Sequence, residues 1–317
     1  MKLILPAAIA DSLTPLHPPQ HGKFEIAWAT KDGTIDGNIA DAEVFVSDPD
    51  FNRKAHHHAL KSAPNLRWYH SASAGVDHIL ADLRSRDIQL TNSAGVFADP
   101  IAETVMGYML AQSKGFFHLR SQQAQHIWSP REDYDELTDK VVLIVGAGGI
   151  GQAIAHRAAA FGMRLWGSRR TPQPQPPFER IVGADAWQDL LPEAHYVVLT
   201  APLTPETKGM MDGAALGKMR PDAYLINVGR GALVEEQALL KALQQRRIAG
   251  AALDTFAAEP LPQDSPFWTL DNVFITPHAS GLSPRNNERI AALFLDNLSR
   301  YQQGLPLRNQ VDLSLAY

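Results

Sequence analysis

Short apolar runs alternate with longer mixed stretches along the whole chain. The clearest run, residues 141–145, is wholly aliphatic, which is typical of a strand buried on both faces of a parallel sheet. An alanine-rich segment, residues 152–161, follows it closely and favours a helix. Because strands that alternate with helices pair in parallel, the pattern predicts parallel sheets covered by helices.

The first hundred residues show this alternation on a small scale. Helix-compatible stretches at 55–62 and 78–86 separate short apolar runs. The strands predicted from those runs are residues 2–5, 24–28, 44–46, 66–70 and 89–91. We therefore expect a small α/β domain of its own in this part of the chain.

One long amphipathic helix is predicted at residues 99–126. Ile101, Val105 and Met109 follow the spacing of a single helix face. Pro100 suits the first helical position and Asp99 suits the cap. A helix of this length could join two domains or form a dimer surface.

The alternation then repeats at larger scale. Strands are predicted at 141–145, 163–167, 195–200, 223–228, 248–253 and 273–276, and a last helix at 284–303. Six parallel strands with crossovers match a doubly wound dinucleotide-binding domain. Residues 171–177 are rich in proline and should form a surface loop.

Length and composition narrow the class of protein. A chain of 317 residues, 45% hydrophobic, is long enough for two domains with sizeable cores. The net charge of −5 gives no indication of a nucleic-acid or membrane partner. Since no apolar run approaches the roughly 18 residues of a membrane span, we expect a cytoplasmic protein.

The chain has no cysteine, which excludes disulfides, thiolate nucleophiles and Cys-ligated metals. His56, His57 and His58 are consecutive, so they cannot all point the same way on a regular element. We interpret them as a solvated segment. No H-E-x-x-H spacing is present, and no metal is expected.

Gly146, Gly148 and Gly151 form a G-x-G-x-x-G pattern, with Gly149 and Ile150 inside it. Such glycines allow a tight turn, close approach to a pyrophosphate and close packing of helix on strand. The free N–H groups of the following helix would bind the phosphates. Glycines also occur in ordinary turns, but a buried strand before and a helix after favour the dinucleotide interpretation.

Three further segments follow the ends of predicted strands. They are INVGRG at 226–231, LDTFAAEPLP at 253–262 and TPHASG at 276–281. Together with GAGGIG at 146–151, and with SASAGVDHI at 71–79, they resemble the D-isomer-specific 2-hydroxyacid dehydrogenases, over most of the chain.

The resemblance implies two Rossmann-like domains with parallel sheets. The dinucleotide-binding domain, residues 99–283, would be inserted into a flavodoxin-like substrate domain made of residues 1–98 plus 284–317. The active site is expected in the cleft between the two domains.

Read through the resemblance, Arg230, Glu259 and His278 are the catalytic residues. His278 would protonate the oxygen of a 2-keto acid as a hydride reaches its carbon. Glu259 would orient the imidazole, and Arg230 would bind the substrate carboxylate. Taken singly, Arg230 could be a surface ion-pair former, Glu259 a turn residue and His278 a partner for a carbonyl; jointly, at strand ends, they favour the catalytic interpretation.

The resemblance also implies further contacts. Asp254 would face the nicotinamide carboxamide. A turn from the other domain would bind the substrate carboxylate through its backbone amides. Cofactor contacts are expected at Thr200, Pro202, Val228, Gly229, Arg230 and His278, and substrate contacts at Ser73, Ala74, Gly75, Val76, Arg230 and His278.

The predicted second strand of the cofactor domain ends without the usual acid. About 18 residues after the last glycine of the pattern, NAD-binding domains carry an Asp or Glu for the ribose 2′-hydroxyl. Here the segment reads Ser168, Arg169, Arg170, Thr171, which could bind a 2′-phosphate. We predict NADP(H) over NAD(H), with NAD(H) still possible, and reduction as the working direction; the alternative is that the arginines are solvated surface charge.

The substrate class stays open within limits. NADPH-dependent relatives suggest glyoxylate or hydroxypyruvate, while a bulkier 2-keto acid or a non-catalytic dinucleotide-sensing protein are alternatives. Formate oxidation is disfavoured because formate-type relatives pair the histidine with glutamine, whereas this chain has Glu259. A homodimer is expected from the resemblance.

Overall fold

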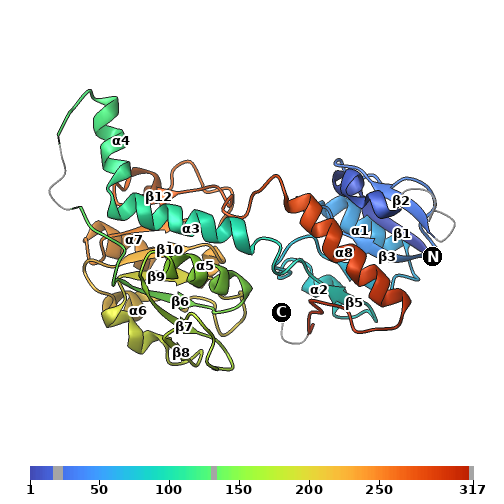
Figure 1. The fold of residues 1–317 in the computed structure, drawn as a ribbon. Helices are drawn as coiled ribbons and strands as arrows, with labels where there is room; N and C mark the ends of the chain where they lie inside the picture. The colour runs from blue at the N-terminus through green and yellow to red at the C-terminus, as the bar shows by residue number, and fades with distance from the viewer. Residues whose placement is uncertain (17–23, 130–133, 314–317) are drawn as a thin grey trace. The chain divides into compact units, whose positions relative to one another are not determined.

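A computed structural model describes residues 1–16, 24–129 and 134–313 (Figure 1). The chain divides into two compact units: residues 1–97 with 283–317, and residues 98–282. The predicted boundaries lay one residue later at both crossings. Each unit is an α/β layer with its own core.

The first unit is built on a five-stranded parallel sheet. Its strands are β1 (Lys2–Pro6), β2 (Glu25–Ala29), β3 (Ala42–Val46), β4 (Trp68–His70) and β5 (Gln89–Thr91). Their order is β2-β1-β3-β4-β5, and every pair is parallel. This is the strand order of flavodoxin-like folds, so the predicted fold class is confirmed.

Apolar side chains cover both faces of this sheet, because successive strand residues point to opposite sides. Ile4 belongs to one core cluster, while Leu3 and Leu5 belong to the other. Trp68 stacks on Phe294, with ring centroids 5.4 Å apart. The helical elements of the unit are η1 (Ala7–Leu16), α1 (Arg53–Ser62), α2 (Leu80–Leu83) and α8 (Asn286–Gln302).

The sequence suggested that the three consecutive histidines form a solvated segment, and the structure shows that this is wrong for His56. They lie on α1, whose inner face turns His56 into the core while His57 and His58 are exposed. The side chain of His56 is 1% exposed and its two ring nitrogens contact Tyr69 Oη and Asp82 Oδ2. A buried histidine with both nitrogens bonded is satisfied, which is why burial is tolerated.

The second unit is a seven-stranded parallel sheet. Its strands are β6 (Val141–Val145), β7 (Arg164–Ser168), β8 (Arg180–Val182), β9 (Tyr196–Leu199), β10 (Tyr224–Asn227), β11 (Gly250–Leu253) and β12 (Val273–Ile275). The order is β12-β11-β10-β9-β6-β7-β8. The strand order reverses between β6 and β9, and ligands bind at this point in doubly wound sheets.

The sequence missed β8, so its prediction of six strands was wrong by one. Arg180 is exposed and Ile181 and Val182 are only partly buried. An edge strand of this kind lacks the continuous apolar run of a central strand.

The helical elements of the second unit cover this sheet. They are α3 (Ala98–Ser113), α4 (Phe116–Ala124), α5 (Gly149–Ala159), α6 (Gly213–Lys218), α7 (Glu236–Gln244), η3 (Trp187–Glu193), η4 (Gly231–Leu233) and η5 (Pro266–Thr269). α3 packs closely on α5.

The single helix predicted at 99–126 is two helices. The chain breaks at Gly115, whose φ of 64° is left-handed, and α4 starts after it. The predicted start of the helix is also wrong. The helix begins at Ala98, so Asp99 is not its cap and Pro100 is not its first residue. Asp99 Oδ1 instead accepts a 2.9 Å bond from Arg157 Nη2 on α5.

In the described part of the chain, no helix is long and apolar enough to span a membrane. The predicted cytoplasmic location stays a prediction.

Candidate active site

The glycine-rich turn between β6 and α5 has the geometry that the fingerprint predicts. Gly146 has a φ of 110°, and a Cβ there would lie 2.6 Å from the backbone nitrogen of Ala201. α5 begins at Gly149 behind Gly148, and among the described residues no side chain caps it. Its first N–H groups and positive dipole end therefore suit the pyrophosphate of a dinucleotide.

Neighbouring strands hold this turn in place. The carbonyl of Ser168, at the end of β7, accepts bonds from Gly146 N at 3.1 Å and Ala147 N at 2.7 Å. Thr200, which follows β9, donates from Oγ1 to the Gly146 carbonyl at 2.8 Å. Thr200 thus supports the turn, and its predicted contact with the cofactor stays a prediction.

The basic segment lies at the carboxyl end of β7. Ser168 is buried, Arg169 is partly exposed, and Arg170 and Thr171 are exposed. Arg169 Nη1 donates a 2.6 Å bond to Gln175 Oε1. A hydrogen bond from Thr204, with a smaller effect of the Arg170 charge, lowers the pKa of Glu206, so an acid lies within electrostatic reach of Arg170.

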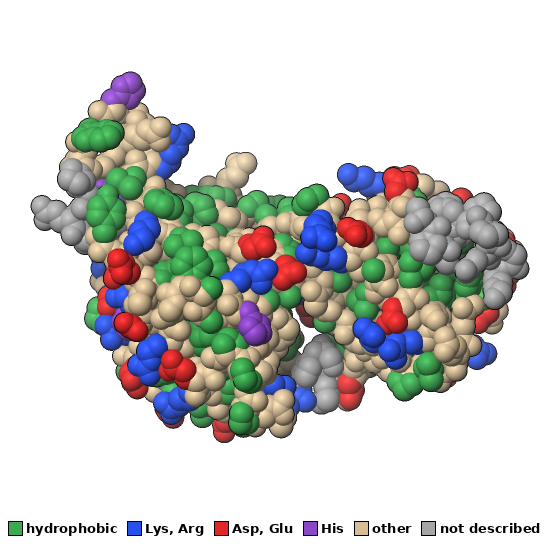
Figure 2. All heavy atoms as spheres, in the orientation of Figure 1, with side chains coloured by type: hydrophobic (Ala, Val, Ile, Leu, Met, Phe, Trp, Pro, Cys, Tyr) green, Lys and Arg blue, Asp and Glu red, His purple; other side chains and the backbone are tan. Residues whose placement is uncertain are grey.

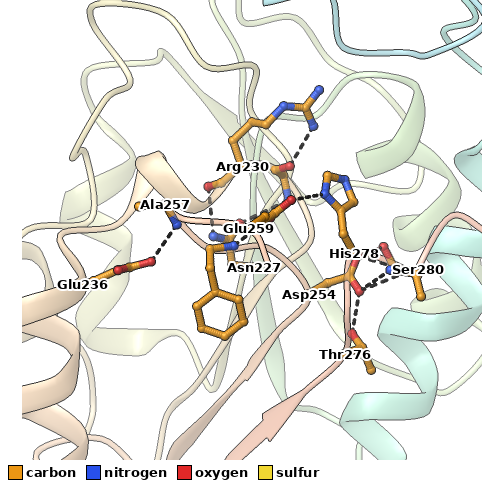
Figure 3. A network of polar contacts seen from close by, with 12 residues as sticks. Asn227, Arg230, Glu236, Asp254, Ala257, Glu259, Thr276, His278 and Ser280 are labelled. Atoms are coloured by element: carbon orange, nitrogen blue, oxygen red, sulfur yellow. Dashed lines mark hydrogen bonds and ion pairs between the residues drawn. The ribbon is translucent and has the colours of Figure 1, made fainter. Parts of the chain in front are cut away.

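Glu259 and His278, predicted from the sequence to act as an acid–base pair, are in direct contact. His278 Nδ1 donates to Glu259 Oε2 at 2.8 Å, and Glu259 Oε1 accepts a 2.9 Å bond from the backbone N–H of Phe256 (Figure 3). Because a carboxylate accepts at Nδ1, that nitrogen carries the proton and Nε2 is left for a substrate. Both side chains are partly exposed, as a site that admits a substrate requires.

Arg230 lies at the carboxyl end of β10, immediately before η4. Its Nη1 donates to the Gly229 carbonyl at 2.9 Å, and its own carbonyl accepts from Asn227 Nδ2 at 3.0 Å. Figure 3 shows Arg230 and His278 extending beyond the strand ends close to Glu259. The structure therefore brings the three predicted catalytic residues together at one edge of the sheet.

Asp254 is held by the loop that carries His278. The carboxylate is 1% exposed and accepts from Thr276 Oγ1 at 2.5 Å, Ala279 N at 2.9 Å, and both the backbone and the hydroxyl of Ser280. The predicted contact with a nicotinamide carboxamide stays a prediction. What the structure assigns to Asp254 is the fixing of residues 276–280.

This anchoring matters because His278 has an unusual backbone. Its φ is 51°, in the left-handed region, which costs about 1–3 kcal/mol for a non-glycine residue. The His278 N–H donates to the Asp254 carbonyl at 2.8 Å. The Asp254 network therefore over-determines a conformation that the histidine would not adopt alone.

Tyr108 extends the same network from α3. Its hydroxyl donates to Thr276 Oγ1 at 2.6 Å, and burial raises the pKa of Tyr108 to about 12. The phenol therefore stays protonated near neutral pH and can donate to Thr276. A tyrosine inside a helix with an ordinary apolar stripe gave no sequence signal of this role.

Glu236, in the first turn of α7, was also missed. Its Oε1 accepts a 2.7 Å bond from the backbone N–H of Ala257, in the loop that leads to Glu259. Nearby, a Cβ on Gly231 would lie 1.9 Å from the backbone carbon of Phe256. The 256–259 loop thus packs directly on the turn after Arg230.

The remaining predicted cofactor residues follow the neighbouring strands. Val228 is 6% exposed, and its N–H donates to the Leu199 carbonyl at 3.3 Å. The Gly229 N–H donates to Asn227 Oδ1 at 3.1 Å. The contacts of Pro202, Val228 and Gly229 with a cofactor stay predictions.

The predicted substrate turn lies in the first unit, after β4. Ser73 N–H donates to Ser71 Oγ at 3.2 Å, and the Ala74 carbonyl accepts from Asn92 Nδ2 at 2.8 Å. Ala74 and Gly75 are partly exposed, while Val76 is buried. Hydrogen bonds with Ser71 and Asn92 thus fix the turn. Its binding of a substrate carboxylate stays a prediction.

One group of three potential metal ligands occurs within the described ranges: His56, His57 and Asp82. The contacts of His56 with Tyr69 and Asp82 already use both of its ring nitrogens. Burial also lowers the pKa of His56. The position of His56 is thus accounted for by its hydrogen bonds within the core.

The fold and the site define a dinucleotide-binding α/β protein with a histidine–glutamate pair at the carboxyl edge of its sheet. Residues 106–280 match the family model described as the NAD binding domain of the D-isomer specific 2-hydroxyacid dehydrogenases. The chain belongs to this family, as predicted from its motifs, and it is a nicotinamide-dependent dehydrogenase of that class.

A curated relative and two solved structures illustrate the family. The chain is 36% identical over 262 residues to glyoxylate/hydroxypyruvate reductase B of Yersinia pestis, covering 80% of this chain and 79% of the relative. A D-isomer specific 2-hydroxyacid dehydrogenase from Xanthobacter autotrophicus Py2, in complex with NADPH and MES, is 29% identical with a TM-score of 0.87, covering 100% of this chain and 99% of that one. The NADPH-dependent glyoxylate/hydroxypyruvate reductase of Sinorhizobium meliloti, in complex with NADP and sulfate, is 25% identical with a TM-score of 0.86 and the same coverage.

Proposed function

We propose that this protein uses NADPH to reduce a small 2-keto acid, of the glyoxylate or hydroxypyruvate type, to the D-2-hydroxy acid. The observation that carries the proposal is the 2.8 Å pair of His278 and Glu259 beside Arg230, at the edge where dinucleotide domains bind their ligands. Relatives named as glyoxylate/hydroxypyruvate reductases support the substrate class.

The side chains divide the chemistry between them. A bound nicotinamide would supply the hydride to the carbonyl carbon. His278 would give its Nε2 proton to the carbonyl oxygen as negative charge develops there. Glu259 would stabilise the imidazolium that donates this proton, and Arg230 would bind the substrate carboxylate with its planar fork. In the reverse direction, His278 would take the hydroxyl proton.

The preference for NADPH rests on the end of β7. Arg169 and Arg170 stand where an NAD-binding domain carries an acid, and Ser168 and Thr171 flank them. A guanidinium binds a 2′-phosphate by charge-assisted hydrogen bonds, while an acid would repel it. The relatives crystallised with NADPH or NADP support this assignment.

The experiment measures initial rates with NADPH and with NADH against glyoxylate, hydroxypyruvate, pyruvate and phenylpyruvate. Wild type should turn over the small keto acids faster, and with NADPH. His278→Ala should lower kcat by about 10²–10⁴-fold, the usual contribution of a positioned general acid. His58→Ala, an exposed histidine on α1, is the matched control and should leave kcat unchanged.

Each other outcome removes a defined part of the proposal. A preference for phenylpyruvate would replace the substrate class with a bulkier keto acid. A preference for NADH would remove the cofactor assignment. Tight NADPH binding without turnover of any keto acid would favour a dinucleotide-sensing protein.

A homodimer is the second part of the proposal. α4 buries none of its residues, and Phe116, Ile127 and Trp128 are large apolar side chains exposed on and after it. Phe117 of α4 stacks on Phe274, with ring centroids 4.2 Å apart, but a nine-residue helix with no buried residue is marginal in water, and hydrophobic side chains lie exposed over it (Figure 2). Beside α4 lies a cavity of about 440 Å³ whose lining includes Phe117 and Phe274. A second copy of the chain would cover this apolar surface.

A further inference from the structure

Several arginines of the second unit are paired with carboxylates, whereas Arg169, like Arg120 with Gln123 Oε1, donates to an amide oxygen. Four of them form ion pairs with carboxylates: Arg157 with Asp99, Arg164 with Glu179, Arg220 with Asp222 and Arg246 with Asp271. Arg169 instead donates to the amide oxygen of Gln175 at 2.6 Å. No carboxylate in the described ranges forms an ion pair with it, so its positive charge is not neutralised at short range.

Gln175 is itself held by a second amide. Its Nε2 donates to Gln152 Oε1, and Gln152 Nε2 donates to the Pro176 carbonyl at 2.5 Å. Gln152 Nε2 also contacts His156 Nε2, one turn further along α5, at 3.0 Å. The bonds run in one direction, from the guanidinium through both amides to a carbonyl.

This direction requires an amide at position 175. The residue must accept from Arg169 through one atom and donate to Gln152 through the other. Glutamate at 175 would have no donor when ionised, and it would add a negative charge against the guanidinium. Alanine would remove both bonds.

The same chain of bonds links the basic segment to the phosphate-binding helix. Gln152 lies in the first turns of α5, directly after the last glycine of the fingerprint. The Arg169 N–H donates to the Val182 carbonyl of β8 at 3.1 Å, so its backbone is fixed as well. The side chain of Phe178 covers Gly167, where a Cβ would lie 2.8 Å from the ring. The 171–179 loop is therefore held at two points, by the hydrogen bond of Gln175 to α5 and by the packing of Phe178 on Gly167 of β7.

We propose that Gln175, backed by Gln152, is a positioning residue that sets the preference for NADPH by holding the Arg169 guanidinium, with its full charge, ready for the 2′-phosphate. The inference rests on the proposed use of NADPH. A guanidinium has five N–H donors, and the bond to Gln175 leaves others for phosphate oxygens. A neutral clamp orders the long arginine side chain before the cofactor binds, which lowers the entropy cost of binding.

The test compares Gln175→Ala and Gln175→Glu in the full-length protein. The first readout is the Kd of 2′,5′-ADP and of 5′-AMP by calorimetry, since only the first carries a 2′-phosphate. The second readout is the ratio of kcat/KM with NADPH to kcat/KM with NADH. Gln173→Glu adds the same charge to the same exposed loop and is the matched control.

We expect Gln175→Ala to weaken 2′,5′-ADP binding by about tenfold and Gln175→Glu by more, as the loss of an ordered charge-assisted contact implies. Binding of 5′-AMP should change by less than about twofold, because it lacks the phosphate that Arg169 binds. The NADPH/NADH ratio should fall in parallel, and Gln173→Glu should keep the wild-type ratio. Gln152→Ala should show a smaller loss in the same direction.

The outcomes separate this inference from the proposed function. If wild type prefers NADPH and Arg169→Ala abolishes that preference, but both Gln175 variants keep it, the inference is wrong and the proposed function stands. Equal weakening of 2′,5′-ADP and 5′-AMP would also overturn it, because the loop would then act only as structure. If wild type itself prefers NADH, the proposed cofactor fails first, and the inference fails with it.

Discussion

At the scale of single residues, His278, the proposed acid–base residue, is fixed from two sides. Glu259 holds its ring, and the Asp254 network holds its backbone in a left-handed conformation. The sequence singled out Arg230, Glu259 and His278 because they lie in motifs that resemble those of the family and follow strand ends; their catalytic roles stay predictions. It could not predict the supports, Tyr108 and Glu236, because a phenol or a carboxylate on a helix has no local pattern that distinguishes an anchor from a surface group.

A buried histidine outside the site makes stability depend on pH. His70, at the end of β4, is completely buried, and burial lowers its pKa from 6.5 to about 3. Its Nδ1 lies 2.8 Å from Thr91 Oγ1. Between those two pKa values the unfolded chain binds a proton that the folded chain does not, so stability falls as the pH drops below about 6.5.

Urea unfolding between pH 7.5 and 5 measures this effect. Replacing His70 with Gln should reduce the pH slope of the unfolding free energy by up to about 1.4 kcal/mol per pH unit. His118→Gln, an exposed histidine, should keep the wild-type slope. Because burial also lowers the pKa of His56, part of the slope should remain in His70→Gln. Identical slopes for wild type and His70→Gln would show that the assignment to His70 is wrong.

At the scale of elements, the sequence predicted the central strands and the presence of most helices. It missed an edge strand, β8, and the break between α3 and α4. Central strands such as β6 are buried on both faces and read as continuous apolar runs. β8 is a half-exposed edge strand without such a run. The break between α3 and α4 depends on Gly115 adopting a positive φ. Because glycine adopts positive and negative φ about equally readily, its presence in a helical pattern does not predict which one occurs.

Gly231 lies where the turn after Arg230 packs on the 256–259 loop, so a substitution there tests whether this packing positions Glu259. A Cβ there would lie 1.9 Å from the backbone of Phe256, so Gly231→Ala must displace the loop that carries Glu259. We expect a loss of about 1–3 kcal/mol in unfolding free energy, as for other overpacked sites. Activity should fall at least about a hundredfold, because small displacements of catalytic groups have effects of this size.

Thermal unfolding and initial rates measure both effects. Gly217→Ala is the control, since a Cβ at this position of α6 would meet nothing within 4 Å. It should leave activity intact and raise stability slightly, because alanine favours a helix over glycine. Activity of Gly231→Ala within twofold of wild type would contradict the described packing.

At the scale of the whole molecule, the sequence predicted the two α/β layers and the insertion of one into the other. It did so because the hydrophobic alternation repeats twice and the family motifs have a fixed order along the chain. Residues such as Trp68 and Phe294, which stack although they lie far apart in sequence, gave no sign of their contact. Pairing across such distances is a property of the fold, not of any local pattern.

The apolar surface of α4 predicts the oligomeric state. Wild type should elute as a dimer in size-exclusion chromatography with light scattering. The double variant Phe116→Ser, Trp128→Ser should shift the protein toward monomer, because it removes two exposed apolar side chains that a second copy would cover. Phe161→Ser, another exposed aromatic of the same unit, is the control and should stay dimeric. A wild type that is monomeric at all concentrations would remove the dimer proposal.

The insertion of residues 98–282 also determines which unit can fold first during translation. The core of the first unit joins Leu3 and Trp68 from the beginning of the chain to Ile290 and Phe294 near its end. The inserted unit is one continuous stretch, so it can fold as soon as it has been synthesised. The first 97 residues must wait until α8 emerges, because until then one face of their sheet is only partly covered, by side chains such as Ile9 and Leu13 of η1. A nascent chain stalled before α8 would therefore be only partly folded, and its first 97 residues would be a target for chaperones.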